Sequence, residues 1–253
     1  MNLFDIKGKK VIVTGAAQGL ANGMAEGLME QGAEVCILDI SSKTQEVAQC
    51  FCDKGYKCHG INVNLGDRKA LAQAFAESVE KLGGHLDGIV NAAGIQKRHF
   101  SEVFPIEDWD AVIEINLTAV FELCQLAGRQ YMKQETGGKI INIASMLSFF
   151  GGYTVAAYAA SKGGIAQMTR ALCNEWASKG INVNAIAPGY MATDMNTTLI
   201  NDKEREAEIL SRIPAKRWGT AEDMKGLVIF LSSAASNYLH GEIIPCDGGY
   251  LSR

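Results

Sequence analysis

Short runs of β-branched and apolar residues alternate along this chain with longer segments of helical periodicity. The runs are Lys10–Thr14, Val35–Asp39, Lys57–Val63, Leu86–Asn91, Lys139–Ala144, Ile181–Ala187 and Glu242–Pro245. Several of them are almost wholly apolar, which is typical of strands covered on both faces. The segments between them predict helices over Gln18–Gln31, Ser41–Lys54, Asp67–Leu82, Ile106–Gln134, Ala156–Lys179 and Thr220–Ser233. This order predicts an α/β fold, a doubly wound parallel sheet of about seven strands with helices on both faces.

One segment interrupts the alternation. Between Pro188 and Pro214 no further strand is predicted, and Asp194–Ser211 has the composition of a short helix outside the sheet. An excursion after the carboxyl end of a strand is typical of a substrate lid. We therefore expect residues 1–253 to form a single domain that carries a lid at about 188–215.

Composition narrows the range of partners. The formal net charge is −4 and no block of Lys and Arg occurs, which argues against nucleic acid and favours a small molecule. The first ten residues lack the apolar core of a signal peptide, and no apolar run approaches the roughly 18 residues of a membrane span. The seven cysteines are irregularly spaced and the four histidines are scattered. Reduced thiols in a cytoplasmic protein are thus expected, with neither disulfides nor a metal site.

The first predicted strand runs into a glycine-containing turn, Thr14-Gly15-Ala16-Ala17-Gln18-Gly19-Leu20-Ala21. Glycines there let the backbone turn tightly and approach a pyrophosphate, and the helix that follows offers free N–H groups. Gly15, Ala17, Gln18, Gly19 and Leu20 are therefore candidate cofactor-binding residues. A glycine turn without a ligand remains the alternative for this motif alone.

Asp39 strengthens the case for a dinucleotide site of the Rossmann type. It closes the second predicted strand, 24 residues after Gly15. A carboxylate at this place accepts hydrogen bonds from the adenosine ribose and repels a 2′-phosphate. Because no arginine accompanies it, the sequence predicts NAD as the cofactor. A helix cap or a solvated strand end is the plainer reading of Asp39 alone.

The ends of the next two strands supply further candidates. Asn62 and Val63, at the end of the third strand, could flank the adenine. Asn91, Ala92 and Gly94 close the fourth strand, where small residues would let the nucleotide lie across the carboxyl edge of the sheet.

Three residues, Tyr158, Lys162 and Ser145, could carry proton-transfer chemistry. Tyr158 and Lys162 are four residues apart and share one face of a predicted helix. A nearby ammonium group favours the phenolate, which lowers the pKa of a tyrosine from about 10. Ser145 follows the fifth strand, 13 residues before Tyr158, where its hydroxyl could stabilise oxyanion charge on a carbonyl. Asn116 lies within a long helical segment and on its own predicts nothing.

The motifs TGAAQGLA, NAAG, Asn116, Ser145, YAASK and Pro188-Gly189 together resemble, in order and spacing, the short-chain dehydrogenase/reductase family. The resemblance covers the whole chain. It implies that Tyr158 is the general acid/base, with Lys162 as its activator and Ser145 as the orienter of the carbonyl. It also implies that Asn116 anchors a water that relays protons to Lys162, and that Pro188, Gly189 and Thr193 contact the nicotinamide half. The chain departs from the commonest pattern at Ala21, Ala92 and Asn62.

A closer likeness within the family concerns the substrate. The stretches GGKIINIASMLSFFGG, NEWASKGINVNAIAPGYMAT, RIPAKRWG and DGGYLSR are similar to the members that act on deoxy-ketogluconates. This likeness implies an NAD-linked enzyme of pectin or uronate breakdown and a cytoplasmic homotetramer. Ser145, Met146 and Tyr158 would then contact a sugar acid, and Arg98 could clamp its carboxylate. Lys216 and Arg217 are alternative cations.

Other functions fit parts of the same pattern. Gluconate 5-dehydrogenase differs mainly in the pocket, and 3-oxoacyl-carrier-protein reductase shares the core motifs but generally prefers NADPH, which Asp39 disfavours. A nucleotide-sensing regulatory protein on the same fold is the alternative outside enzymes, although such proteins often lose the Tyr or Lys that this chain keeps.

Overall fold

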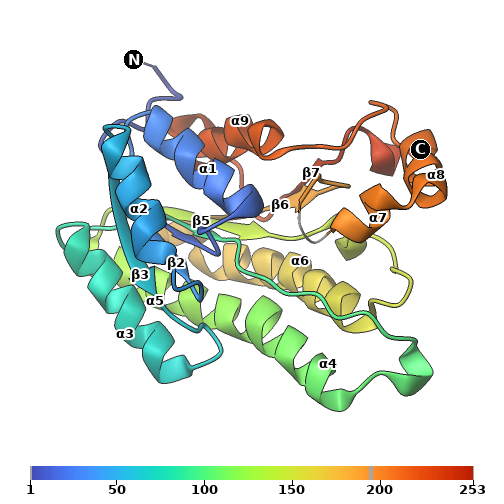
Figure 1. Cartoon of the computed structure of the whole chain (residues 1–253). Helices are drawn as coiled ribbons and strands as arrows, with labels where there is room; N and C mark the ends of the chain where they lie inside the picture. Colours follow the sequence, from blue (N-terminus) through green and yellow to red (C-terminus); the bar gives the residue numbers. More distant parts are fainter. Residues whose placement is uncertain (1, 194–195, 253) are drawn as a thin grey trace.

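The computed structural model describes residues 2–193 and 196–252 (Figure 1). Seven parallel strands form one sheet in the order β3-β2-β1-β4-β5-β6-β7. They are β1 (Lys10–Thr14), β2 (Glu34–Asp39), β3 (Lys57–Asn62), β4 (Gly88–Asn91), β5 (Gly138–Ile143), β6 (Ile181–Pro188) and β7 (Ile243–Cys246). The predicted fold class is confirmed, and each strand begins and ends within two residues of its predicted bounds.

The helices occupy the predicted segments between strands. They are α1 (Gly19–Glu30), α2 (Thr44–Asp53), α3 (Arg68–Lys81), α4 (Ile106–Ile113), α5 (Ala119–Gln134), α6 (Ala156–Trp176), α7 (Thr197–Asn201), α8 (Lys203–Arg212) and α9 (Ala221–Ser232). The predicted helix Asp194–Ser211 is two helices, α7 and α8, and Asp194 itself lies outside the described residues.

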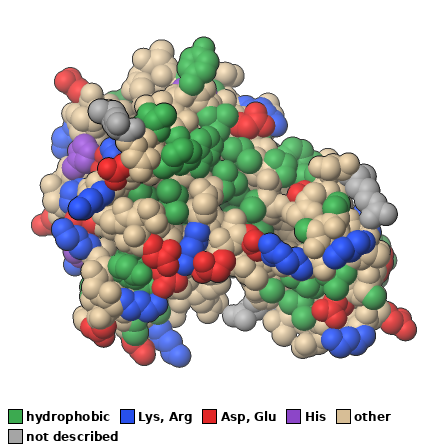
Figure 2. Space-filling view, turned by 90° about the horizontal axis from the view of Figure 1, so that it is seen from above, with side chains coloured by type: hydrophobic (Ala, Val, Ile, Leu, Met, Phe, Trp, Pro, Cys, Tyr) green, Lys and Arg blue, Asp and Glu red, His purple; other side chains and the backbone are tan. Residues whose placement is uncertain are grey.

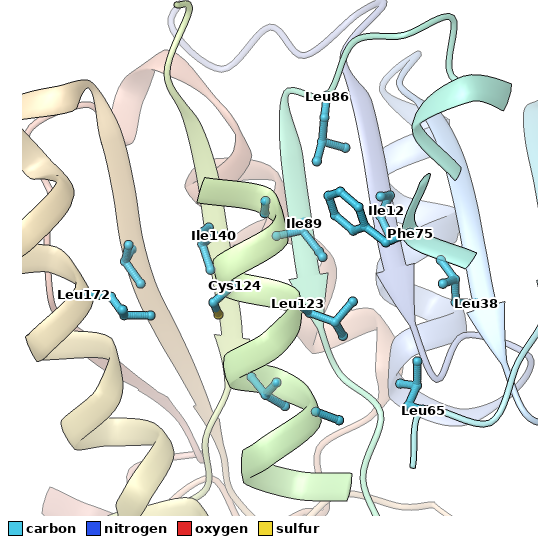
Figure 3. Packing of buried hydrophobic residues seen from close by; sticks show 14 of the residues in the cluster. Ile12, Leu38, Leu65, Phe75, Leu86, Ile89, Leu123, Cys124, Ile140 and Leu172 are labelled. Atoms are coloured by element: carbon cyan, nitrogen blue, oxygen red, sulfur yellow. The ribbon is translucent and has the colours of Figure 1, made fainter. Parts of the chain in front are cut away.

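The sheet separates two hydrophobic cores. On one face, side chains of β1 and β4 pack with α3, α5 and α6, and Figure 3 shows Phe75, Leu123 and Leu172 from these helices pointing toward the strands. On the other face, residues of α1, α2 and α9 cover alternate strand positions such as Val13 and Ile37. Figure 1 shows α1 and α9 on one side of the sheet, with α4 and α6 on the other. Burial on both faces explains why the strand sequences are almost continuously apolar.

The strand order reverses between β1 and β4. From β1 the chain moves outward through β2 to β3, then crosses back to place β4 on the opposite side of β1. Crossovers on the two sides of this point lie on different faces, which leaves a crevice outside the carboxyl ends of these strands. The fold therefore locates a ligand site beside the ends of β1 and β4.

The long segment Ile106–Gln134 is broken by a π-helical turn, Glu114–Thr118, between α4 and α5. By length and hydropathy alone this segment could cross a membrane. Its side chains Leu123 and Cys124 are fully buried in the core beside the sheet, as in the core helix of a globular protein.

A third, smaller core joins α8 to the rest of the molecule. Ile209 and Ile213 pack there with Met146 and Tyr250, while Trp218 lies at its edge. Helices α7 and α8 thus lie outside the sheet, over the carboxyl ends of β5 and β6 (Figure 1).

Candidate active site

The turn after β1 approaches the end of β4 too closely for a side chain. Gly15 has φ +72°, and a methyl group on it would lie 2.7 Å from the Cα of Ala93. The hydroxyl of Thr14 accepts hydrogen bonds from the N–H groups of Ala92 (3.0 Å) and Ala93 (3.1 Å). Gly19, the first residue of α1, also has positive φ, and its missing side chain faces open space. The backbone is therefore held in place for a group that needs close approach to a helix N-terminus.

Asp39 lies at the end of β2 with its carboxylate fixed by the backbone. Its Oδ2 accepts from Ala17 N–H (3.0 Å) and its Oδ1 accepts from Ser41 N–H (2.9 Å). The two hydrogen bonds orient the carboxylate while leaving lone pairs free on both oxygens. This geometry suits the hydroxyl groups of a ribose.

A cavity of about 570 Å³ follows the carboxyl ends of the strands. It is lined by many of the predicted residues, namely Gly15, Gln18, Gly19, Leu20, Asp39, Val63, Ala92, Gly94, Ser145, Tyr158, Lys162, Pro188, Gly189 and Thr193. Its size and its position at the reversal of strand order are those of small-molecule and cofactor sites. The glycine turn, the fixed carboxylate and the open helix end fit a dinucleotide.

Other predicted residues lie outside the wall of this cavity. Asn62 points along the strand ends, where its amide donates to Ser41 O (2.7 Å). Asn91 is buried and donates to Asn142 Oδ1 (2.9 Å). Met146 belongs to the core beside α8, and Arg98 is exposed. Ala17 contributes through its backbone, as described above, and Asn116 lies behind the cavity.

Ala21 and Ala93, which belong to the TGAAQGLA and NAAG motifs, and Met191, which the sequence offered as a possible pocket residue, also line the cavity. Further lining residues that sequence reasoning did not select are Met24, Ile40, Asn64, Leu65, Ile95, Ile115, Ile143, Ala144 and Asn196. Asn64 follows the third strand by two positions and carried a usable signal, because residues just past a strand's carboxyl end lie at this edge. The apolar residues in this group carried no such signal, because an apolar residue that lines a cavity cannot be told from an ordinary core residue by sequence alone.

Tyr158 and Lys162 project from one face of α6 into the cavity. The ammonium nitrogen lies 5.6 Å from the centroid of the tyrosine ring and donates to Ile143 O (2.6 Å). Burial lowers the pKa of Lys162 to about 8. Burial also raises the pKa of Tyr158, while a hydrogen bond with Ser145 and the charge of Arg98 act in the opposite direction. Before any ligand binds, the tyrosine is therefore a neutral proton donor at pH 7.

Ser145 is the N-cap of a short 3-10 helix, Met146–Ser148, that follows β5. Its hydroxyl accepts from Leu147 N–H (3.1 Å), and its own N–H is close to the hydroxyl of Ser148 (3.3 Å). That second hydroxyl donates to Lys162 O (2.6 Å), so the turn is tied to α6. The Ser145 hydroxyl is thereby held facing Tyr158, where both could bind one substrate oxygen.

Asn116 occupies the π-helical turn between α4 and α5 and is fully buried. Its amide makes a reciprocal pair with Ile95, accepting from the N–H (2.8 Å) and donating to the carbonyl (2.9 Å). A methyl group on the adjacent Gly94 would lie 3.3 Å from Asn116 Oδ1 and 3.8 Å from Lys162 Nζ. The π turn therefore places this amide behind the lysine, at the closed end of the cavity.

This fold and this site define a dinucleotide-dependent oxidoreductase, and the comparison with known proteins agrees. The family profile described as enoyl-(acyl carrier protein) reductase matches residues 15–251. The chain belongs to the short-chain dehydrogenase/reductase family, and its homologues include dehydrogenases that act on alcohol groups of sugar acids.

Individual relatives are similar over their full length. The chain is 43% identical to 2-dehydro-3-deoxy-D-gluconate 5-dehydrogenase of Escherichia coli strain K12, covering 100% of this chain and 99% of that protein. It is 40% identical to 5-keto-D-gluconate 5-reductase of the same strain, covering 99% and 98%. A crystal structure from Agrobacterium tumefaciens, provisionally described as a 2-deoxy-D-gluconate 3-dehydrogenase with bound NADP, superimposes with a TM-score of 0.93 at 42% identity, covering 100% of both chains.

Proposed function

We propose that this enzyme interconverts a secondary alcohol and a ketone on a deoxy-ketogluconate-type sugar acid, with NAD(H) as the hydride carrier. The observation that carries the proposal is the convergence of Ser145, Tyr158 and Lys162 at the closed end of a dinucleotide-sized cavity. Full-length similarity to 2-dehydro-3-deoxy-D-gluconate 5-dehydrogenase supports the substrate class. The similarity to a 5-keto-D-gluconate reductase makes a ketogluconate the alternative substrate.

Each residue has a distinct role in the proposed chemistry. Bound nicotinamide supplies or accepts the hydride. The Ser145 hydroxyl donates a hydrogen bond to the substrate oxygen and fixes its position. Tyr158 gives a proton to that oxygen in the reducing direction and removes it in the oxidising direction. The ammonium group of Lys162 favours the phenolate form, and the Asn116 amide behind it would hold a water through which that proton is exchanged with solvent.

The preference for NAD over NADP rests on Asp39. A 2′-phosphate would meet a carboxylate that two backbone N–H groups hold in place. Among the other residues proposed to contact the cofactor, Val63 would flank the adenine, whereas Pro188, Gly189 and Thr193 would contact the nicotinamide half. Asn62 and Asn91 would act through the backbone they fix, because the Asn62 amide donates to Ser41 O just past the end of β2 and the Asn91 amide donates to Asn142 on β5.

Arg98 is proposed to hold the substrate carboxylate. Its two basic neighbours both bind Asp108, His99 at 2.7 Å and Lys97 at 3.3 Å. Among the described residues no carboxylate pairs with Arg98, yet its charge influences the pKa of Tyr158. A free guanidinium group near the reacting hydroxyls suits a carboxylate at the far end of a sugar acid. Met146 would support the same pocket from the core beside Ser145.

We further propose a cytoplasmic homotetramer, built of single-domain subunits, that works in pectin or uronate breakdown. The exposed apolar side chains Phe121 and Met132 on α5, together with Ile106 on α4, support a subunit contact on this side. Helices α7 and α8 would serve as the substrate lid.

The substitution Tyr158→Phe tests the proposed chemistry. Removing the phenol hydroxyl should lower kcat by about 10³-fold, within the range of general acid–base catalysis, and leave the Kd for NADH within about twofold. The matched control is Tyr153→Phe, since Tyr153 is 75% exposed and keeps its ring contact with Phe100 as a phenylalanine. A Tyr158→Phe enzyme with near-wild-type kcat would rule out the assignment.

A further inference from the structure

Both ends of the lid region, residues 188–215, pack against one short turn near the C-terminus. At the entrance, a methyl group on Gly189 would lie 2.6 Å from the Cα of Asp247. At the exit, Ala215 N–H donates to Gly248 O (3.0 Å), and a methyl group on Gly248 would lie 3.0 Å from Ile213 Cγ2. Residues 247–249 therefore form a common base for both ends of the lid.

Hydrogen bonds from backbone N–H groups hold the turn 247–249 in place. The carboxylate of Asp247 accepts hydrogen bonds from Gly249 N–H and Leu251 N–H, both at 2.8 Å. Gly248 and Gly249 have φ values of +65° and +89°, a conformation that other residues adopt only with strain. The position of the next side chain, Tyr250, is consequently set by the turn rather than by the lid.

The ring of Tyr250 contacts three separate segments. It stacks on Phe150 from the loop after β5, with ring centroids 5.9 Å apart, and meets the edge of Tyr190 from the loop after β6 at 5.4 Å. The guanidinium group of Arg212, the last residue of α8, lies 4.9 Å above the same ring. Only 7% of the Tyr250 surface is exposed.

These contacts link the lid to the reacting hydroxyls. Tyr250 shares its core with Ile209 of α8 and with Met146, which directly follows Ser145 in the chain. The turn that holds Ser145 is also fixed by hydrogen bonds of its own, Leu147 N–H to the Ser145 hydroxyl and the Ser148 hydroxyl to Lys162 O, so α8 can move away from this core while Ser145 keeps its place. Aromatic pairs and a cation over a ring each add a modest attraction, so several together can hold a lid that still opens.

We propose that Tyr250 is a positioning residue that latches helices α7 and α8 over the substrate end of the cavity. The inference rests on the proposed function, because the lid must cover a sugar acid. Tyr250 does not line the nucleotide cavity, and its ring contacts are with Phe150, Tyr190 and Arg212 rather than with Tyr158. It therefore acts on substrate retention and not on proton transfer. If Tyr250 were only an ordinary core residue, its removal would lower the stability of the whole molecule and would not loosen the lid in particular.

Hydrogen exchange of the lid amides provides a test that needs no substrate. In Tyr250→Ala, the amides of residues 203–212 should exchange about tenfold faster, whereas those of β4 and β5 should be unchanged. Tyr250→Phe keeps the ring contacts and should stay close to the wild type. Tyr238→Ala is the matched control, since that tyrosine is fully exposed. Lid exchange that is unchanged in Tyr250→Ala, or equally faster in the strands, would overturn the proposal.

Steady-state kinetics test the consequence for the substrate. Tyr250→Ala should raise KM for the sugar acid about tenfold with kcat within twofold and the Kd for NADH unchanged, and Tyr250→Phe should restore most of the affinity. If Tyr250→Ala does not fold, Arg212→Met can replace it, because it removes the exposed cation that lies over the Tyr250 ring. It should likewise speed exchange of the lid amides and raise KM for the sugar acid. A fall in kcat without a change in KM would contradict the latch. A wild-type protein that reduces no sugar acid would instead refute the proposed function, and the exchange experiment would still decide on the latch.

Discussion

Lys162 is a buried lysine whose ammonium group donates to a backbone carbonyl, Ile143 O, rather than to a carboxylate. Burial without an opposite charge disfavours the protonated form and lowers the pKa of this group to about 8. The unfolded chain has an ordinary lysine there, with a pKa near 10.5. Between these two values the unfolded state binds more protons than the folded state, so the contribution of Lys162 to stability improves as the pH rises from 8 to 10.5.

The substitution Lys162→Met should therefore stabilise the cofactor-free protein while abolishing activity. At pH 7 we expect a gain of about 2 kcal/mol in the free energy of unfolding, because no ammonium group has to be buried. The gain should shrink toward pH 10.5, where the lysine is neutral in both states. Urea unfolding at pH 7 and pH 10 measures the difference. Equal stability of both proteins at pH 7 would mean that Lys162 is not buried as a charge.

At the scale of elements, the sequence predicted the strands and most helices because each must bury apolar side chains with a fixed period. The glycine turn, Asp39 and the Tyr158–Lys162 pair were also predictable, since each sits at a strand end or a helical spacing that the pattern defines. Asn116 was predictable only from the family resemblance and not from the helical pattern, because a π-helical turn adds one residue to the helix without a sequence signal. The side-chain direction of Asn62 was not predictable, because it depends on bonds to the adjacent strand end.

The turn after β1 offers a test of one element. Gly15→Ala forces an alanine into positive φ and against Ala93, where a methyl group would lie 2.7 Å from Cα. We expect NADH binding to weaken at least tenfold and the free energy of unfolding to fall by about 2 kcal/mol. Gly226→Ala is the matched control, because this exposed helical glycine in α9 has open space around it and should gain about 0.5 kcal/mol. Isothermal titration with NADH and urea unfolding measure both variants. Normal cofactor binding by Gly15→Ala would show that the close approach is unnecessary.

Across the whole molecule, helices from the N-terminal and C-terminal parts of the chain meet where α1 packs on α9 (Figure 1). Lys225 of α9 forms ion pairs with Glu30 (2.9 Å), Glu26 (3.6 Å) and Glu222 (2.8 Å). Its side chain is only 12% exposed, because the alkyl part lies over Gly27. In Figure 2, which views the face formed by α1 and α9, basic and acidic side chains gather near the middle of the surface. The network joins residues that are 195 positions apart in the sequence.

Lys225→Met should weaken this junction. The thioether keeps most of the packing over Gly27 but removes the cation from Glu30 and Glu222, whereas Glu26 keeps its ion pair with Lys54 (2.7 Å). Burial alone would lower the pKa of Lys225, but the hydrogen bonds and charges of Glu222 and Glu30 together outweigh it and hold the pKa above its usual value. The whole contribution is therefore present at neutral pH and would be lost only at strongly alkaline pH. We expect a loss of about 1 kcal/mol in the free energy of unfolding at low ionic strength, and a smaller loss in 1 M salt. A loss that does not depend on salt would indicate packing rather than charge.

The proposed NAD-linked interconversion of deoxy-ketogluconates can be followed by the absorbance of NADH at 340 nm. Purified protein would be assayed with 3-deoxy-2,5-diketogluconate, with 5-ketogluconate and with an acetoacetyl thioester, each with NADH and with NADPH. We predict rapid oxidation of NADH with the deoxy-diketo sugar acid and much slower oxidation of NADPH. Turnover of the thioester, chiefly with NADPH, would contradict both the substrate class and the role given to Asp39.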